Sequence, residues 1–312
     1  MVAFAFIACT VVAAPAGASP ARHAKLSSIL FVNPLPNYPA WKAGGQCMRA
    51  RAKQVGIPYT ETGPAGNALD PTAMIQQVQQ GIANKVGAII TFPATDGFAP
   101  VLSQARKAGI VVGTLYGAPA SAATGSDVNV GADFTQEGQV FEQAIAKRPG
   151  QQIVGLMAQG PTGAATLGWQ NGFKAAAKKS KNVKVVATVY TGDDTSKALA
   201  QANALLTAHP EINVIASHMG TATAGATAAI KAKHLVGKVV FVGNGAANGG
   251  IAGLADHTIY KFLVQDGCGA VKKIIDAVET VSEGKKVPAQ INVGLKMVGS
   301  SDYKLYLKKG WQ

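Results

Sequence analysis

The sequence predicts an α/β protein with two Rossmann-like lobes, each built around a parallel β-sheet. Short apolar runs alternate with amphipathic helical segments between residues 28 and 281, and this alternation is typical of right-handed βαβ units. There are about ten such units, which is more than one doubly wound sheet usually holds. A run of small residues at 117–125, GAPASAATG, marks the expected boundary between the lobes.

The expected strands are short buried runs bounded by Gly, Pro or polar residues. The run at 87–92, GAIITF, illustrates the pattern, because Pro93 ends it. The expected strands cover residues 28–32, 87–92, 110–115, 153–157, 183–189, 214–216, 239–242 and 259–264.

The expected helices combine apolar residues at helical spacing with recognisable start signals. Asp70-Pro71 begins one of them, because Asp can cap a helix and Pro suits its first turn. Either Asp194 or Thr195 caps a later helix that runs to residue 206. The other expected helices cover residues 39–55, 101–108, 135–147, 167–178, 222–231 and 271–281.

The composition indicates a well-buried core and gives no sign of a nucleic-acid partner. Of the 312 residues, 48% are hydrophobic and only 14% are charged, and the length suffices for two domains. The net charge of +13 is spread along the chain, and its densest run, 174–184, reads as an exposed helix end. That run lacks the interleaved aromatic residues that a single-strand binder needs.

The N-terminus resembles a secretion signal. Residues 4–14 form an apolar run too short to span a bilayer, and Ala16-Gly17-Ala18 follows as an A-x-A cleavage site. Residues 1–26 are therefore expected to be a signal peptide and a mature N-terminal tail, and the protein to be exported to the periplasm or the cell surface. Cys9 lies in a weak lipoprotein-like context, so a lipid anchor stays an open alternative.

Removal of that leader leaves two cysteines, Cys47 and Cys268, in an oxidising compartment. Such a pair is more often a disulfide than two free thiols. Two cysteines so far apart supply too few ligands for a metal, and the five histidines show no ligand spacing, so no metal site is expected. The histidines are His23, His209, His218, His234 and His257.

Candidate ligand-binding residues follow the strands, because ligands of open parallel sheets sit beyond the carboxyl ends of the strands. Each has a structural alternative. Prolines 34, 36 and 39 can simply shape a turn, the two tryptophans can be core residues, the two aspartates can be helix caps, and the histidine can be buried and neutral. The candidates are Tyr38, Trp41, Thr95, Asp96, Tyr116, Trp169, Asp193, His218 and Asn244.

Catalytic motifs are absent: the chain contains neither G-x-S-x-G nor H-E-x-x-H. The run 243–249, GNGAANG, approximates a dinucleotide fingerprint, and Asp266 follows at the distance of a ribose-binding acid. The motif is weak and late in the chain, and an exported protein meets little NAD. We therefore expect no enzyme and no cofactor.

Ordered sequence motifs resemble the ribose-binding kind of sugar-binding proteins of bacterial ABC transporters, over residues 27–300. Pro39-Ala40-Trp41, with a helix ending at Gly56, is similar to the family's first cleft loop, and 108–112, AGIVV, is similar to its aGIPVV strand. Further matching pieces follow in the same order as in the family. They are 70–77, 87–90, Pro93, Thr95-Asp96, Asn171-Gly172-Phe173, 205–210, 241–243 and 264–266.

The chain departs from this family at its sugar-clamping positions. Trp169 stands where the family commonly has an Arg, His218-Met219 replaces an Asn-Asp pair, and Asn244 and Tyr116 replace aspartates. Gln265 is retained and joins the candidate ligand-binding residues. Because Trp cannot copy the planar donors of Arg, a less hydroxylated or partly apolar ligand becomes plausible.

The resemblance implies a type I periplasmic binding protein, with a three-segment hinge between lobes that close on a ligand. The implied lobes are 27–117 with 266–292 and 118–265 with 293–312, crossed near 116–125, 264–265 and 292–295. It places Cys47 and Cys268 together on the first lobe.

The implied function is capture of a small polar ligand, a sugar, sugar alcohol or sugar-derived molecule, for import. The implied partner is the membrane permease of an ABC transporter, with the binding protein as a monomer. The alternative is an exported sensor for a small signal or a heterocyclic or aromatic ligand, because the fold alone does not separate the two roles.

Overall fold

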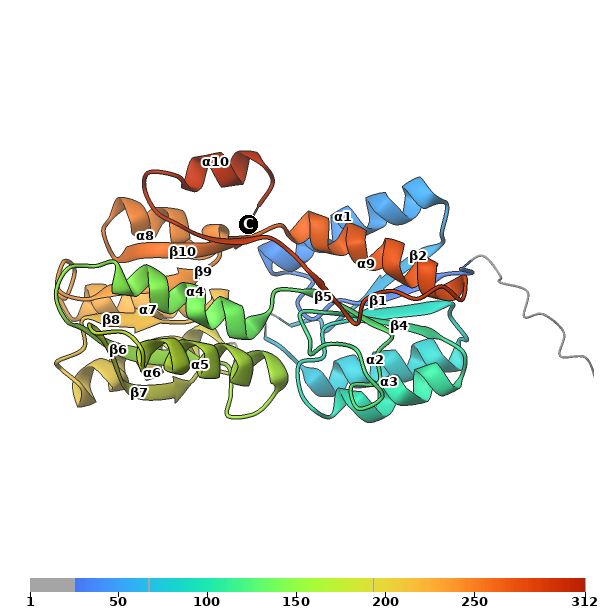
Figure 1. Ribbon diagram of the computed structural model, residues 1–312, viewed down its shortest axis with the longest axis horizontal. Coiled ribbons are helices and arrows are strands. Elements are labelled where there is room, and N and C mark those ends of the chain that lie inside the picture. The colour runs from blue at the N-terminus through green and yellow to red at the C-terminus, as the bar shows by residue number, and fades with distance from the viewer. Residues whose placement is uncertain (1–25, 67, 193, 312) are drawn as a thin grey trace, which may run out of the picture.

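The computed structural model describes residues 26–66, 68–192 and 194–311, and shows two α/β lobes side by side (Figure 1). Each lobe contains one six-stranded sheet. The expected signal peptide lies outside the described residues. None of the described helices is both long and apolar enough to span a bilayer.

The sheet of the first lobe has the strand order β11-β5-β4-β3-β1-β2, and every neighbouring pair is parallel. Helices α1 (Pro39–Val55) and α9 (Gly267–Ser282) pack on one face, and α2 (Pro71–Ala83) and α3 (Phe98–Lys107) on the other. Its strands are β1 (Ile29–Val32), β2 (Tyr59–Thr62), β3 (Ala88–Thr91), β4 (Val111–Leu115), β5 (Val128–Gly131) and β11 (Gln290–Asn292).

The sheet of the second lobe has the order β12-β10-β9-β8-β6-β7, and only the β10–β12 pair is antiparallel. Its strands are β6 (Gln152–Ala158), β7 (Val183–Tyr190), β8 (Val214–Ala216), β9 (Val240–Asn244), β10 (Ile259–Gln265) and β12 (Leu295–Val298). Its helices are α4 (Phe134–Ala146), α5 (Ala164–Ala177), α6 (Thr195–Ala208), α7 (Gly220–Ala232), the π-helical turn η1 (Ala246–Gly250), α8 (Ile251–Ala255) and α10 (Tyr303–Lys308).

Helix caps identified in the sequence have the expected geometry. The Asp70 carboxylate accepts a hydrogen bond from the Ala73 N–H at 3.0 Å, and Pro71 occupies the first turn of α2. Of the two alternatives for α6, Asp194 is the cap, because its carboxylate accepts from the Lys197 N–H at 2.7 Å. These bonds satisfy amide groups that have no partner within the helix.

The expectation that the first boundary between the lobes lies at 117–125 is wrong. β5 continues the first sheet, with Gly113 opposite Val128, so this lobe extends through Gly131 and the chain first crosses immediately after it. The 117–125 segment is a loop within the first lobe. Its start is held by the Asn129 side chain, which accepts from the Gly117 N–H at 2.9 Å and donates to the Gly117 carbonyl at 3.1 Å.

The three crossings lie beside one another. The second runs from β10 into α9 and the third from β11 into β12. The Val293 N–H donates to the Gly131 carbonyl at 3.2 Å, and the Asp266 N–H donates to the Gly294 carbonyl at 3.2 Å. The chain segments that join the lobes are therefore hydrogen-bonded to each other.

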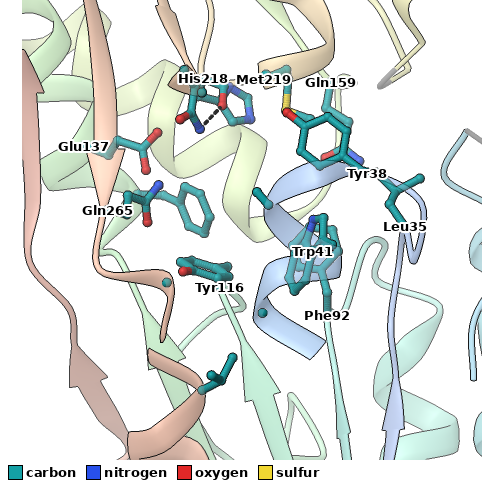
Figure 2. Close-up of a pocket in the computed structure, with 18 residues that line it drawn as sticks. Leu35, Tyr38, Trp41, Phe92, Tyr116, Glu137, Gln159, His218, Met219 and Gln265 are labelled. Carbon is teal, nitrogen blue, oxygen red and sulfur yellow. Dashed lines mark hydrogen bonds between the residues drawn. The ribbon is translucent and has the colours of Figure 1, made fainter. Parts of the chain in front are cut away.

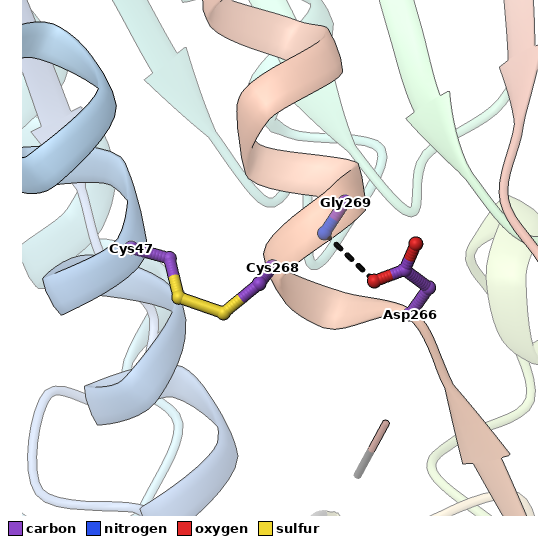
Figure 3. Close-up of a disulfide and its surroundings, with 4 residues drawn as sticks. All are labelled: Cys47, Asp266, Cys268 and Gly269. Atoms are coloured by element: carbon purple, nitrogen blue, oxygen red, sulfur yellow. Dashed lines mark hydrogen bonds between the residues drawn. A yellow bond between two sulfur atoms is a disulfide. The ribbon is translucent and has the colours of Figure 1, made fainter. Parts of the chain in front are cut away.

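The expected disulfide is present. Cys47 in α1 is bonded to Cys268 in the first turn of α9, with Cα atoms 5.5 Å apart (Figure 3). The Asp266 carboxylate caps the same turn by accepting from the Gly269 N–H at 2.9 Å. The bond joins residues 221 positions apart, so it ties the returning C-terminal part of the first lobe to its N-terminal part.

Candidate ligand-binding site

A cavity of about 170 Å³ lies between the lobes, at the carboxyl ends of strands from both sheets (Figure 2). The position fits the rule that ligands of parallel sheets bind beyond the carboxyl ends of the strands. The lining residues are Leu35, Tyr38, Ala40, Trp41, Gly44, Phe92, Tyr116, Phe134, Glu137, Gln159, His218, Met219, Gly220, Asn244, Gly245, Gln265, Gly267 and Val271.

The first lobe contributes a group of aromatic rings. Trp41, in the first turn of α1, has its ring centroid 5.8 Å from that of Phe92 and 5.9 Å from that of Tyr116, which it meets edge to face. Phe31 lies behind Trp41, with centroids 6.5 Å apart. Such edge-to-face and tilted arrangements are favourable for aromatic pairs, so the rings hold one another in place around the cavity.

Tyr116 has an unusual backbone conformation. Its φ is +55°, in the left-handed region that residues other than Gly seldom adopt. Its N–H donates to the Val130 carbonyl at 3.0 Å, which fixes the backbone directly after β4. The constrained turn places the Tyr116 ring in the wall of the cavity, consistent with the accumulation of such conformations at functional sites.

The second lobe contributes most of the polar groups. Asn244, at the end of β9, donates from Nδ2 to the His218 carbonyl at 2.9 Å, which links the segments after β8 and β9. Gln159 follows β6 and Gln265 ends β10. These amide side chains can donate and accept hydrogen bonds, as a ligand with hydroxyl groups requires.

His218 is buried and neutral. Its ring lies 4.8 Å from the Trp169 ring and 6.3 Å from the Phe134 ring, and burial lowers the His218 pKa to about 3. Within the described part of the chain, its Nδ1 atom has no hydrogen-bond partner. His218 therefore brings an uncharged hydrogen-bonding edge to the cavity.

Glu137 is the acidic residue of the cavity lining and lies in the first turn of α4. Its side chain is 1% exposed, and neither carboxyl oxygen has a hydrogen-bond partner among the described residues. Burial raises the Glu137 pKa to about 8, because a low-dielectric environment disfavours the charged form.

The lobes meet across the cavity. A Cβ atom built at Gly220, the first residue of α7, would overlap the Tyr38 hydroxyl group from the other lobe. A Cβ atom at Gly163 would lie 3.7 Å from the Ala94 carbonyl oxygen, also across the lobes. The absence of a side chain at Gly220 thus permits the close approach of the first lobe.

A family model described as a periplasmic binding protein domain matches residues 29–286 of this chain. The chain belongs to the periplasmic binding protein family. Both lobes of this periplasmic binding protein lie largely within the match, and the chain has no match among curated proteins.

Solved structures share the two-lobed fold. A glucose-galactose binding protein from Geobacillus stearothermophilus is 23% identical, with a TM-score of 0.84 over 90% of this chain and 99% of the other. An ABC transporter solute-binding protein from Actinobacillus succinogenes with bound D-allose is 23% identical, with a TM-score of 0.79 over 90% and 100%. One from Agrobacterium vitis with bound D-fucose is 20% identical, with a TM-score of 0.82 over 91% and 99%.

The structure of this periplasmic binding protein brings six of the ten residues expected from the sequence to the cavity. The expectation of a single cavity is wrong for three others, and Asp193 lies outside the described residues. The six lining residues are Tyr38, Trp41, Tyr116, His218, Asn244 and Gln265.

Thr95 and Asp96 line a second cavity of about 250 Å³ within the first lobe, next to α3. The chain turns away from the interlobe cavity after Phe92-Pro93, so Phe92 faces the ligand cavity in place of Thr95. The site matched to the family by sequence position is thus displaced by the direction of this turn.

Trp169 belongs to the core and does not line the cavity. It is fully buried between α4 and α5, with its ring 5.5 Å from Phe141 and 5.8 Å from Phe173. The structural alternative considered for Trp169 is the one observed.

Several lining residues were missed by the sequence analysis. Phe92, Gln159 and Met219 each follow a strand closely, so the strand-end rule could have found them. Glu137 and Phe134 lie at the start of α4, and the unrecognised β5 hid the fact that the chain enters the second lobe there.

The dinucleotide-like motif does not form a phosphate loop. The 243–249 run ends β9 and enters η1, in which Asn248 and Gly249 leave helical φ and ψ values. Asp266 caps α9 through the Gly269 N–H. Within the described residues, no cluster of three or more His, Cys, Asp or Glu side chains could hold a metal ion.

Proposed function

We propose that this protein captures a sugar, sugar alcohol or sugar-derived molecule between its lobes and delivers it to the membrane permease of an ABC transporter. The observation that carries the proposal is a cavity in which an aromatic wall from one lobe faces a polar wall from the other. Sugars offer both an apolar ring face and hydroxyl groups, and such sites match them with flat side chains and amides.

The similar structures support the sugar class. Their names include a glucose-galactose binding protein and transporter proteins with bound D-allose and D-fucose. The polar groups that line this cavity are mostly neutral, with Gln159, Asn244 and Gln265 among them. A neutral or weakly charged polar ligand fits this set.

Export and a binding role are also part of the proposal. The Cys47–Cys268 disulfide is of the kind that persists in oxidising compartments such as the periplasm. The described residues of the cavity lining include no Ser, Thr or Cys, and His218 lies against aromatic rings with a low pKa. We therefore propose binding without catalysis, by a monomer.

A thermal-shift screen tests the proposal. D-allose, D-fucose, D-galactose, D-glucose, D-tagatose, D-ribose and D-glucitol are added to the full exported chain, together with a set of small heterocycles. A ligand present at about 100 times its Kd stabilises the folded state by roughly 2.7 kcal/mol, so at least one sugar or polyol should raise the Tm. If only heterocycles raise the Tm, the sugar class is wrong and the alternative of a sensor for such ligands gains support.

A further inference from the structure

Glu137 is an acidic side chain in a cavity whose other polar side chains are mostly neutral. Its side chain is 1% exposed and both carboxyl oxygens are unpartnered among the described residues. A buried carboxylate without a partner is costly, and natural proteins normally pair it. Burial without a partner therefore keeps the Glu137 pKa high, and a cation bound beside the side chain would lower that pKa and stabilise the carboxylate.

The neighbouring helix end does not satisfy Glu137. The N-terminus of α4 attracts negative charge, but Asp133 already occupies it, accepting from the Thr135 N–H at 2.9 Å and the Gln136 N–H at 3.1 Å. The Glu137 N–H itself donates to the Asp133 carbonyl at 2.8 Å. The Thr135 and Gln136 amides are thus bonded to Asp133 and do not donate to the Glu137 carboxyl group.

No cationic side chain serves Glu137 either. Among the described residues that line the cavity, none is Lys or Arg. The titratable groups that act on this region are Tyr116, whose pKa is raised by burial and by the Glu137 and Asp266 charges, and His218, which is neutral. Asp266 adds a second negative charge from the start of α9.

A second unpartnered acceptor lies on the same side of the cavity. The Gln265 Oε1 atom is buried and has no partner within the described residues, and Figure 2 shows Gln265 and Glu137 on the same side. Together the two side chains present three unpartnered oxygens. A primary ammonium group carries three N–H donors and a positive charge, so it matches these oxygens in number and in sign.

The aromatic wall suits the same group. Trp41, Phe92 and Tyr116 form this wall and line the cavity. Aromatic faces attract cations, and Trp and Tyr do so most strongly. A cation placed between this wall and the Glu137 carboxylate is favoured from both sides.

We propose that the ligand carries a primary ammonium group, held by Glu137 and Gln265 against the aromatic wall, so that the solute is an amino sugar or amino alditol. The inference rests on the proposed function for the sugar part of the ligand. The ammonium part rests on Glu137, Gln265 and the aromatic rings, and it extends the proposed function to a charged class of solute.

Isothermal titration calorimetry at pH 7 with matched amine and hydroxyl pairs tests the inference. The pairs are D-glucosamine with D-glucose, D-galactosamine with D-galactose, and 1-amino-1-deoxy-D-glucitol with D-glucitol. Putrescine serves as a primary amine without a sugar skeleton. In the unchanged protein, at least one amine should bind about tenfold or more tightly than its hydroxyl partner, as expected for a hydrogen-bonded charge pair.

Two glutamate variants make the experiment specific. Glu137→Gln keeps the size of the side chain and should remove the amine preference, so that the amine binds no more than about threefold more tightly than its hydroxyl partner in this variant. The matched control is Glu142→Gln, because Glu142 is also buried in α4 with an unpartnered Oε1 but does not line the cavity. It should keep the full preference, and the pair preference of the unchanged protein is a test even if Glu137→Gln fails to fold.

The outcomes separate the two proposals. If hydroxyl compounds bind as tightly as their amines, or if the preference survives in Glu137→Gln, the ammonium inference is wrong and the proposed function stands. If putrescine binds through Glu137 while no sugar amine does, the ammonium contact stands and the sugar class is wrong. If no compound of the set binds, both proposals fail.

Discussion

The first lobe gives the cavity aromatic rings, whereas the second lobe gives it most of its polar groups. Trp41, Phe92 and Tyr116 contact one another, so their wall keeps its shape through its own packing. Glu137, His218 and Gln265 instead carry buried atoms that have no partner among the described residues. The rings of the aromatic wall pack against each other without a ligand, whereas we expect a ligand to supply hydrogen-bond partners to the polar side chains of the second lobe.

The difference separates affinity from specificity. A rigid aromatic wall offers apolar contact to any flat or ring-shaped solute, at little cost in side-chain entropy. Unpartnered polar atoms discriminate more sharply, because a solute that fails to satisfy them leaves them buried and unpaired. The second lobe should therefore decide which solute is bound.

Trp169→Ala should have the largest effect of the variants that test this contrast. Trp169 lies beneath the polar wall and is fully buried, so Trp169→Ala should lower the free energy of unfolding by about 3–5 kcal/mol. Chemical denaturation measures the effect. A stability loss below about 1 kcal/mol, together with loss of binding, would return Trp169 to the ligand-binding residues.

Glu137→Gln should change how stability depends on pH. Burial raises the Glu137 pKa from 4.5 to about 8, so the folded state binds a proton more tightly than the unfolded state. The free energy of unfolding of the unchanged protein therefore falls as pH rises from about 4.5 to about 8, by roughly 5 kcal/mol at most. The variant loses this dependence.

Denaturation curves of both proteins between pH 4.5 and 8 measure the difference. His218 acts in the opposite sense: its pKa is lowered from 6.5 to about 3, so its contribution is lost as pH falls below 6.5. Because both proteins contain His218, the variant-minus-wild-type difference isolates Glu137. A difference that is flat with pH would show that the Glu137 carboxyl group meets water or a cation in the free protein.

Trp41→Ala tests the aromatic wall directly. Trp41 is only partly buried, so the change should weaken ligand binding by ~1–3 kcal/mol, the worth of burying a large apolar side chain. Calorimetry with the ligand found by screening measures the loss. Trp311→Ala, a tryptophan outside the cavity lining, is the control, and an equal loss of affinity in both variants would contradict a specific role for Trp41.

Gly220→Ala should have the smallest effect, because it disturbs only the approach of the two walls. The added Cβ overlaps the end of the Tyr38 side chain, which can shift, so we expect a loss of about 1 kcal/mol in affinity and little change in stability without ligand. Gly160→Ala is the matched control, since its Cβ meets nothing within 4 Å. Equal affinities of the two variants would mean that the lobes need not approach this closely.

Long, strongly patterned elements were predictable from the sequence. Helix α1 begins and ends where the proline and glycine signals place it, at Pro39 and before Gly56. Strand β5 was not predictable, because its four residues, VNVG, contain one polar residue and a glycine and lack a long apolar run. Its burial comes from its neighbours in the sheet, β4 and β11, and β11 lies far from it in the sequence.

The residues of the candidate site were likewise predictable only in part. The strand-end rule located Tyr116, His218 and Asn244 because sheet geometry alone puts them at the cavity. It failed for Thr95, where a turn of a few residues reverses direction, and for Trp169, whose direction depends on packing within α5. The residues next to Glu137 in the sequence do not indicate its role, because that role depends on the burial of its carboxyl group in the folded protein.

The disulfide has a mechanical consequence for the cavity. Cys268 and the Asp266 cap fix the first turn of α9 to α1, so this turn cannot rotate relative to the first lobe. Any bending of the second crossing must be absorbed just before it, at Gln265. Gln265 presents an acceptor to the cavity and also lies where we expect the second crossing to bend. A ligand that binds Gln265 would therefore contact the segment whose bending changes the angle between the two lobes.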